Sequence, residues 1–201
     1  GNRNIACATC HHPRFGTSDG LSLGLGEGGI GLGPARRADP QNLPEQRIPR
    51  NSPALFNLGA REVTVMFADG RIEVDPSRPS GLRTPLEDEM TGGFANLLSA
   101  QTMFPAGAWE ILSERVASLP DYAAQFAAVY PDIAAGREIA FTDISNAIAA
   151  FIAWEWRSDQ SPFDTFLQDG TPLPEAAMRG MDLFYGTAGC AGCHSGPLLT
   201  D

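Results

Sequence analysis

Four cysteines form two copies of one pattern, one near each end of the 201-residue chain. The cysteines, with the histidine that follows each pair, are Cys7, Cys10 and His11 in the first copy and Cys190, Cys193 and His194 in the second. This C-x-x-C-H spacing is typical of covalent c-type haem attachment. Two thiols three positions apart on a helical turn can each reach one vinyl group of the porphyrin, and the next residue places an imidazole beneath the iron. We therefore predict two covalent haem c groups, with the two histidines as proximal iron ligands.

Two other chemistries use paired cysteines. Two pairs could together bind one zinc ion, but zinc ribbons usually separate their pairs by about 15–20 residues. Here the pairs lie near opposite ends of the chain, and zinc gives no reason for a histidine after each pair. A redox-active C-x-x-C explains one pair poorly and two pairs worse. No cysteine is left over for a disulfide framework, so haem attachment is favoured.

Few other side chains in the sequence could coordinate a haem iron. The chain has three histidines and no lysine, and His12 directly follows His11, so its side chain should point away from the same iron. The remaining candidates are tyrosines and the methionines Met66, Met90 and Met103. A methionine is by default a core residue. We therefore hypothesise that the first iron is five-coordinate or water-bound and can react with a peroxide. The sixth ligand of the second haem is expected beyond residue 201.

Irregular segments separate the first haem motif from the helical part of the chain. Residues 20–33 are rich in glycine, and a proline-rich loop continues to about Pro53. Gly24, Gly26 and Gly29 match G-x-G-x-x-G, but no strand precedes the match and no helix follows it, which excludes a dinucleotide site. We expect a flexible loop that covers another part of the protein. Residues 61–75 predict a short hairpin around the turn at Asp69-Gly70, and another loop covers residues 76–93.

Helices are predicted after that point. Their expected ranges are 108–119, 121–130 with a cap at Asp121, 142–156 with a cap at Thr142 or Asp143, and 175–185. The third has a stripe of apolar residues at helical spacing, formed by Ile144, Ala147, Ile148, Phe151 and Ile152. The fold class is therefore mainly α, as two cytochrome c-like haem domains with long Gly/Pro-rich loops and little β structure. We place the N-terminal, peroxidatic haem domain at residues 1–158 and the start of the C-terminal one at 159–201.

The composition limits which partners and which cellular compartment we expect for the protein. The formal net charge is −10 and every basic residue is an arginine. An acidic surface argues against nucleic acid and anionic membranes as partners. No apolar run approaches the roughly 18–20 residues that cross a bilayer. The sequence starts without a charged and apolar leader, so we expect a periplasmic protein whose signal peptide has been removed.

Further motifs occur in a fixed order between and around the two haem motifs. They are Arg50-Asn51-Ser52-Pro53-Ala54-Leu55-Phe56-Asn57, Asp69-Gly70-Arg71, Leu98 with Gln101, Glu110, the stretch from Ser161 to Leu167, the stretch from Gly180 to Phe184, and Gly196-Pro197. Together they resemble the superfamily of bacterial dihaem cytochrome c peroxidases and MauG. The glycine-rich segment and the run from Gln101 to Pro105 look most like the MbnH branch, which is associated with copper-peptide gene clusters.

The chain departs from that family in two places that bear on function. The classical peroxidases carry a distal histidine on the first haem, and this chain has no histidine between residues 13 and 193, which resembles MauG. The family's tryptophan before Asp-Gly-Arg is Ala68 here. Charge transfer between the haems would then need another route, for which Trp109, Trp154 and Trp156 are candidates.

The resemblance implies roles for matched residues. Glu110 would move a proton between the two peroxide oxygens as their bond breaks, although it could equally be a solvated helix residue. Gln101 would orient Glu110 or the peroxide. Asn57 matches a calcium ligand, so one Ca²⁺ is a further candidate cofactor, and a turn-capping role is the alternative.

Three functions follow. The first is a MauG-like enzyme in which H2O2 generates a high-valent dihaem state that oxidises a tryptophan-type residue of a partner protein. The second is a classical cytochrome c peroxidase, which reduces H2O2 to water with electrons from a small redox protein. The third is a dihaem electron-transfer cytochrome without turnover. The missing distal histidine favours the first, and Glu110 with Gln101 argues against the third.

Overall fold

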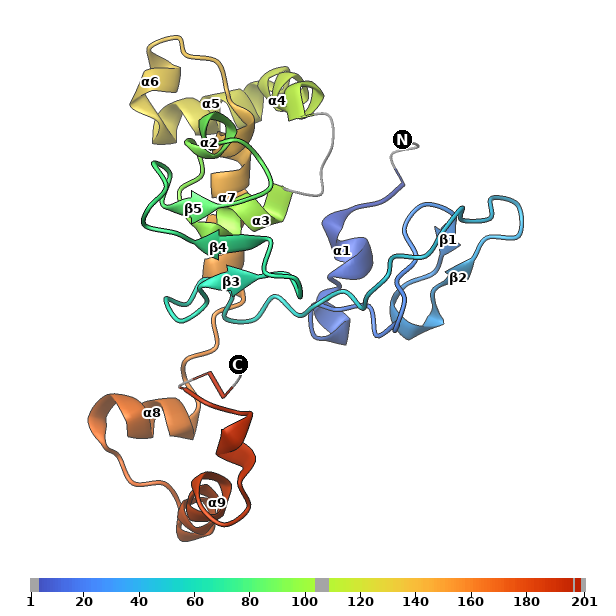
Figure 1. The fold of residues 1–201 in the computed structure, drawn as a ribbon. Coiled ribbons are helices and arrows are strands. Elements are labelled where there is room, and N and C mark those ends of the chain that lie inside the picture. Colours follow the sequence, from blue (N-terminus) through green and yellow to red (C-terminus); the bar gives the residue numbers. More distant parts are fainter. Residues whose placement is uncertain (1–3, 104–108, 197, 200–201) are drawn as a thin grey trace. The chain divides into compact units, whose positions relative to one another are not determined.

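A computed structural model of the chain describes residues 4–103, 109–196 and 198–199 (Figure 1). The chain divides into two units, and each is described by itself. Unit 1 comprises Gly1–Ala60 and Thr64–Arg157, and unit 2 comprises Arg61–Val63 and Ser158–Asp201. Phe104, Pro105 and Pro197, named above, lie outside the described residues.

Helices dominate the described part of both units, with short strands between them, which confirms the mainly helical fold. Unit 1 contains the helices α1 (Cys7–Cys10), α2 (Asp88–Thr91), α3 (Leu97–Met103), α4 (Trp109–Ala117), α5 (Pro120–Val129), α6 (Pro131–Ala134) and α7 (Phe141–Glu155). Unit 2 contains α8 (Pro162–Asp169) and α9 (Glu175–Tyr185). The strands are β1 (Gly29–Ile30), β2 (Arg37–Ala38), β3 (Val65–Met66), β4 (Ile72–Val74) and β5 (Leu82–Arg83). Within the described residues, none of these helices is long and apolar enough to cross a bilayer.

The predicted hairpin is confirmed as β3 and β4, which pair antiparallel, and β5 adds a third strand beside β4. At its turn, Arg71 forms an ion pair of 2.6 Å with Asp69 and lies over the Phe67 ring, 5.1 Å from its centroid. Ile72 is fully buried and Met66 is 7% exposed. Met66, one of the candidate iron ligands, is therefore a core residue of this small sheet.

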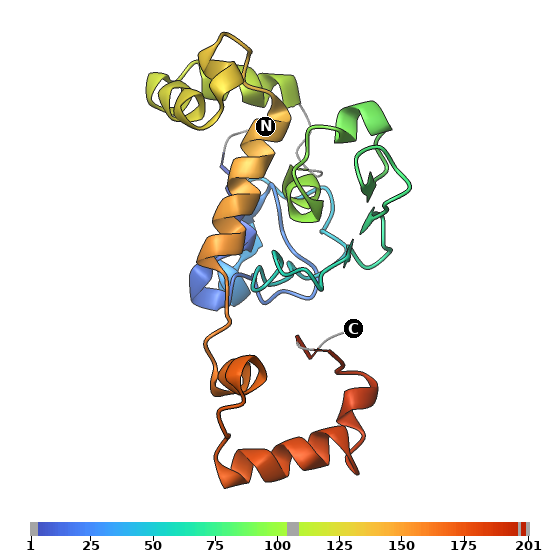
Figure 2. The ribbon, with the colours of Figure 1, turned by 90° about the vertical axis from the view of Figure 1, so that its left-hand side faces the viewer.

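The long helix α7 organises the helical part of unit 1. Figure 2 shows it with α4, α5 and α6 gathered at its N-terminal end. Ile144, Ala149 and Ile152 are buried, and the Ser145 hydroxyl donates a hydrogen bond to the Ser99 carbonyl of α3.

The predicted apolar stripe of α7 is partly wrong. Ala147 is exposed and Phe151 is 57% exposed. The helix is apolar around much of its circumference, so periodicity could not decide which of two overlapping stripes faces α3. The packed stripe contains Ser145 and Ala149, whose small side chains permit a close approach to α3.

The helix starts also differ from the prediction. Helix α5 begins at Pro120 with Leu119 as its N-cap, so Asp121 lies in the first turn instead of capping it. Proline suits this position because its fixed φ is helical and its missing N–H would have no helical partner. In α7 the N-cap is Ala140, and Asp143 accepts the N–H of Ala140 at 2.8 Å from inside the first turn.

Asp143 should contribute more to stability than its neighbour Asp132, although both bind Arg137. The Asp143 carboxylate receives two guanidinium N–H groups at 2.8 and 3.2 Å, and its side chain is 8% exposed against 58% for Asp132. We expect Asp143→Ala to lower the free energy of unfolding by about 1–2 kcal/mol, because the start of α7 loses its cap. Asp132→Ala is the matched control and should cost less, since exposed ion pairs contribute little. Urea unfolding of both variants tests this, and equal losses would contradict it.

Candidate haem sites and the acidic cavity

The first haem motif is a single helical turn. The N–H of Ala6 donates to Thr9 Oγ1 at 3.0 Å and the N–H of His11 donates to the Cys7 carbonyl at 2.8 Å, which closes the turn. Both thiols are free, and Cys7 is exposed while Cys10 is half-buried. The two sulfur atoms and the imidazole thus follow one another around α1, as thioether attachment requires.

The His11 imidazole is oriented by its Nδ1 atom. Nδ1 lies 3.0 Å from the Pro53 carbonyl oxygen and 3.1 Å from the Thr17 carbonyl oxygen. A carbonyl only accepts, so Nδ1 carries the proton, and Nε2 is left as the nitrogen with a free lone pair. Metal-bound histidines commonly fix their tautomer in this way. Ser52 Oγ also lies beside the ring, 3.1 Å from Nδ1 and 3.2 Å from Nε2.

Two segments far apart in sequence hold this ring between them. Thr17 is fully buried with a φ of 59°, a left-handed conformation that is unusual for a β-branched residue. Its hydroxyl accepts the N–H of Leu55 at 2.7 Å. The Ser18 hydroxyl donates to the Ser52 carbonyl at 2.6 Å. The Arg50–Asn57 motif therefore supplies backbone and hydroxyl groups that hold the ring of His11.

His12 has a local role. Its Nδ1 accepts the N–H of Arg14 at 3.2 Å, and its ring packs on Phe15. It thereby caps the turn that follows His11, in agreement with the expectation that it points elsewhere.

The glycine-rich segment is organised around one buried arginine. The Arg36 side chain donates to the carbonyls of Leu25, Gly26 and Gly31 at 2.7, 2.8 and 2.8 Å. A Cβ on Gly29 would lie 2.7 Å from the guanidinium, so glycine is required where the backbone passes Arg36. No helix or strand was expected in this loop. Three of its backbone carbonyls thus surround the buried guanidinium of Arg36.

Cys10 differs from the exposed Cys7 in its surroundings. Burial raises the pKa of the Cys10 thiol, and the nearby carboxylate of Asp19 raises it further. At a given pH the thiolate fraction of Cys10 is therefore lowered, and the thiolate is the reactive form.

In haem-free, reduced protein, iodoacetamide at pH 7.5 should therefore alkylate Cys10 severalfold more slowly than Cys7. Fragment-ion mass spectrometry of the tryptic peptide 4–14 separates the two positions. Unfolding in urea is the control and should remove the difference. Equal rates in the folded protein would show that the burial of Cys10 has no effect on its reactivity.

The second haem motif repeats this geometry in unit 2. The N–H of His194 donates to the Cys190 carbonyl at 3.0 Å, and the His194 Nδ1 lies 3.1 Å from the Leu199 carbonyl oxygen. Cys190 and Cys193 are free and exposed. As in His11, the carbonyl acceptor places the imidazole proton of His194 on Nδ1, so its Nε2 keeps a free lone pair. The two motifs share this arrangement although their supporting segments are unrelated in sequence.

An apolar hollow lies next to the second motif. Its volume is about 400 Å³, within the usual size range of small-molecule pockets. Phe163, Met181 and Phe184 line it, and so does Leu199, whose carbonyl holds His194. The Phe184 ring centroid is 6.3 Å from that of His194. Free thiols, an available Nε2 and an apolar wall fit a covalently bound haem.

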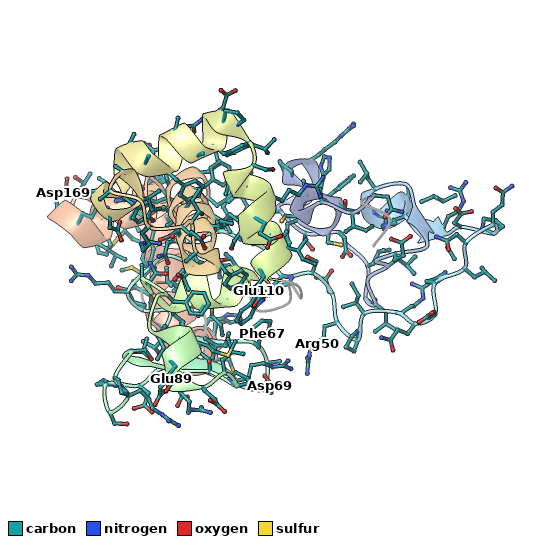
Figure 3. All side chains as sticks on the ribbon, turned by 90° about the horizontal axis from the view of Figure 1, so that it is seen from above. Arg50, Phe67, Asp69, Glu89, Glu110 and Asp169 are labelled. Atoms are coloured by element: carbon teal, nitrogen blue, oxygen red, sulfur yellow. The ribbon has the colours of Figure 1, made fainter. Side chains whose placement is uncertain are left out.

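Glu110 lies in the first turn of α4 (Figure 3) and is exposed. It lines a cavity of about 670 Å³ together with Glu114, Glu138, Trp109 and Phe141. The Trp109 and Phe141 rings are stacked with centroids 4.2 Å apart. The carboxylate thus faces an open, acidic cavity with an aromatic wall, which is accessible to a small polar molecule.

Gln101 lies on the preceding helix, α3, and is half-buried. Residues 104–108 connect α3 and α4 and lie outside the described residues. The pairing of Gln101 with Glu110 therefore stays a prediction. The other two candidate tryptophans differ in burial, since Trp154 is 81% exposed and Trp156 packs its ring edge against Phe56 at 5.5 Å.

Asn57 occupies a turn. Its φ is 57°, its N–H donates to the Trp156 carbonyl, and its own carbonyl accepts the N–H of Ala60, both at 3.0 Å. Asparagine tolerates this left-handed conformation, which fits the turn-capping alternative. Among the described residues, histidine, cysteine and acidic side chains form no cluster of three or more that could hold a metal ion. The calcium ligand at Asn57 stays a prediction.

Sequence reasoning missed the groups that position His11. Thr17, Ser52 and Pro53 act largely through backbone atoms, which leave little trace in a sequence. The signal that marked two of them is the Arg50–Asn57 motif, which contains Ser52 and Pro53. Arg36 carried a weak signal of its own, since it is a charged residue shortly after a glycine-rich segment.

Comparisons with known proteins identify relatives over the whole length of this chain. Relatives include a cytochrome-c peroxidase IdrP2 of Pseudomonas sp. (strain SCT), 30% identical over 203 residues, and the methylamine utilization protein MauG of Methylorubrum extorquens, 30% identical over 201 residues. The alignments cover 100% and 98% of this chain but 45% and 46% of those proteins. The chain therefore spans a little under half of their length.

A solved structure shares the fold. It is the crystal structure of a MauG-like protein associated with microbial copper homeostasis, with a TM-score of 0.61 and 24% sequence identity. The match covers 100% of this chain and 50% of the other. The di-haem cytochrome c peroxidase family matches residues 1–171, which include the first haem motif and end before the second. The chain belongs to the di-haem cytochrome c peroxidase family, whose members include MauG-type proteins.

Proposed function

We propose that this chain binds two covalent haem c groups and takes part in H2O2-dependent oxidation. Haem 1 would be attached to Cys7 and Cys10, and haem 2 to Cys190 and Cys193. The observation that carries the proposal is the shared geometry of the two histidines. His11 and His194 each direct Nδ1 to a backbone carbonyl, so that Nε2 keeps its lone pair, on a turn whose two thiols are unpaired. The Ser52 hydroxyl lies 3.2 Å from the Nε2 of His11.

The proposed reaction uses haem 1 as the peroxide site. When bound, the haem supplies the redox chemistry that splits the O–O bond. Glu110 would transfer a proton between the peroxide oxygens from its position on the open cavity, with Gln101 as the orienting group. Met66 packs in the small sheet at 7% exposure, which supports its role as a core residue.

The electron donor would be a residue of a partner protein. Each H2O2 takes up two electrons and two protons to give two water molecules, so the donor loses two electrons. A tryptophan-type side chain on the partner fits the MauG-like reading, which the lack of a distal histidine supports. A classical peroxidase, supplied by a small redox protein, is the second candidate, and relatives named cytochrome-c peroxidase favour it.

The proposal also concerns the division into domains, the cellular compartment and a calcium ion. Residues 1–158 and 159–201 would belong to separate haem domains. The protein would act in the periplasm, where c-type haem attachment takes place. A calcium ion at Asn57 would need further oxygen ligands besides the asparagine side chain.

Addition of H2O2 to the diferric protein without reductant tests these alternatives. A persistent oxidised spectrum of both haems that decays on addition of a tryptophan-bearing protein supports the MauG-like function. Activity that requires prior one-electron reduction supports the classical peroxidase. No reaction in either state would leave an electron-transfer cytochrome and overturn the peroxidase proposal.

A further inference from the structure

Asp19 is a fully buried carboxylate that the proposed chemistry leaves unused. Its Oδ1 accepts the N–H of Leu21 at 3.1 Å. Its Oδ2 is buried and has no hydrogen-bond partner in the described part of the chain. Burying a carboxylate with an unpartnered oxygen opposes folding, so such a group calls for an explanation beyond packing.

The position of Asp19 ties it to the first haem motif. It follows directly after Thr17 and Ser18, whose carbonyls contact His11 Nδ1 and the N–H of His12 at 3.1 and 3.3 Å. On its other side the backbone of Gly24 passes closely, because a Cβ there would lie 3.1 Å from Asp19 Oδ2. The glycine-rich loop therefore helps to bury this carboxylate, which directly follows the residues that contact His11 and His12.

Asp19 shares its loop with one buried cation, Arg36. The Arg36 guanidinium donates to three backbone carbonyls of the loop. Asp19 Oδ2, in contrast, has no hydrogen-bond partner in the described part of the chain, so the carboxylate forms no ion pair with this guanidinium. Both groups lie near enough to the Cys10 sulfur to act on it electrostatically.

We propose that Asp19 is a buried charge that lowers the reduction potential of haem 1. Removing an electron from a haem adds positive charge, and a fixed negative charge in a low-dielectric environment favours that oxidised state. The groups beyond the iron ligands, with the burial around them, commonly set a haem potential. The inference rests on the proposed attachment of haem to Cys7 and Cys10. Asp19 would thereby bias haem 1, and not haem 2, towards the oxidised states that peroxide chemistry requires.

The test compares Asp19→Asn with the wild-type holoprotein in a spectroelectrochemical titration that resolves both haems. The asparagine keeps the shape and the acceptor for the Leu21 N–H but removes the charge. We expect the ferric–ferrous equilibrium of haem 1 to shift about tenfold towards ferrous, which is 59 mV for one electron. The potential of haem 2 should not change. Asp39→Asn is the matched control, because Asp39 lies in the same loop and accepts the N–H of Gln41 in the same way but is half-buried.

The outcomes separate this inference from the proposed function. If the wild-type protein carries no haem on Cys7 and Cys10 by mass spectrometry, the proposed function fails before any variant is made. If Asp19→Asn retains both haems and the potential of haem 1 is unchanged, the inference is overturned. If Asp19→Asn does not assemble, Asp19→Ser, which is also neutral and can accept the Leu21 N–H, should give the same upward shift. Failure of both neutral variants to retain haem would make Asp19 structural and would likewise overturn the inference.

Discussion

Replacing Cys7 and Cys10 together by alanine should abolish the reaction with H2O2, whereas replacing Cys190 and Cys193 together should preserve peroxide binding. Each double variant should contain one covalent haem instead of two. The two double variants should differ because few side chains could serve as a distal ligand of haem 1. On the N-terminal side of residue 193 the sequence contains no lysine and no histidine other than His11 and His12. His12 is occupied as an acceptor for the Arg14 N–H. Haem 1, bound as proposed, would thus lack a strong distal ligand from this part of the chain.

Haem content is measured by the pyridine haemochrome spectrum, and peroxide binding by stopped-flow absorbance of the ferric protein. The two double variants are matched controls for one another, because each removes two thiols and one haem. Peroxide binding that is lost in the Cys190/Cys193 variant but kept in the Cys7/Cys10 variant would reverse the assignment of the reactive haem. A purely low-spin electron paramagnetic resonance signal from haem 1 would also contradict it.

Replacing Arg36 by methionine should lower the free energy of unfolding of unit 1 by about 4 kcal/mol. The guanidinium is 6% exposed and donates to three carbonyls, and hydrogen bonds that involve a charged group contribute roughly 1.5–3 kcal/mol each. Methionine has a similar length, so the loss is chiefly that of the three donors. The carbonyls of Leu25, Gly26 and Gly31 would then have to accept hydrogen bonds from water, which requires the loop to open.

The adjacent Arg37 provides the matched control. It is exposed on β2, so Arg37→Met should change stability by less than about 0.5 kcal/mol. Urea unfolding followed by circular dichroism gives both values, and hydrogen exchange locates the change. Faster exchange confined to residues 24–31 in the Arg36 variant is expected. Equal effects of the two substitutions would show that the loop does not depend on the buried guanidinium.

The sequence predicted the elements whose signals are local. The helix over residues 175–185 is found at Glu175–Tyr185, and the hairpin around Asp69-Gly70 is found as β3 and β4. Helix α8 was missed, although Ser161 caps it, Pro162 occupies its first position and the Asp164 carboxylate accepts the N–H of Ser161 at 2.8 Å. That capping box is a local signal, but the predicted helices did not include this segment.

The features that could not be predicted depend on tertiary contacts. The spacing of the cysteines indicates the haem-attachment residues, but one of the two carbonyls beside His11 Nδ1, that of Pro53, lies 42 positions away. Likewise, the carbonyls around Arg36 are brought together by the course of a glycine-rich backbone, which has no periodicity. The exposure of Phe151 follows from which face of α7 meets α3, and periodicity alone leaves that choice open.

The two histidines differ in how much of the chain must fold before their rings are fully held. His194 Nδ1 lies beside the Leu199 carbonyl, five residues away. His11 Nδ1 has a similarly near carbonyl at Thr17, six residues away, and a second one at Pro53, 42 residues away. Short contacts of this kind can hold both rings early, whereas the second contact of His11 forms only after a long loop has closed, which costs more conformational entropy. Loosening of the segment around Pro53 should therefore remove one of the two carbonyls at the N-terminal motif and leave the contact of His194 with Leu199 in place.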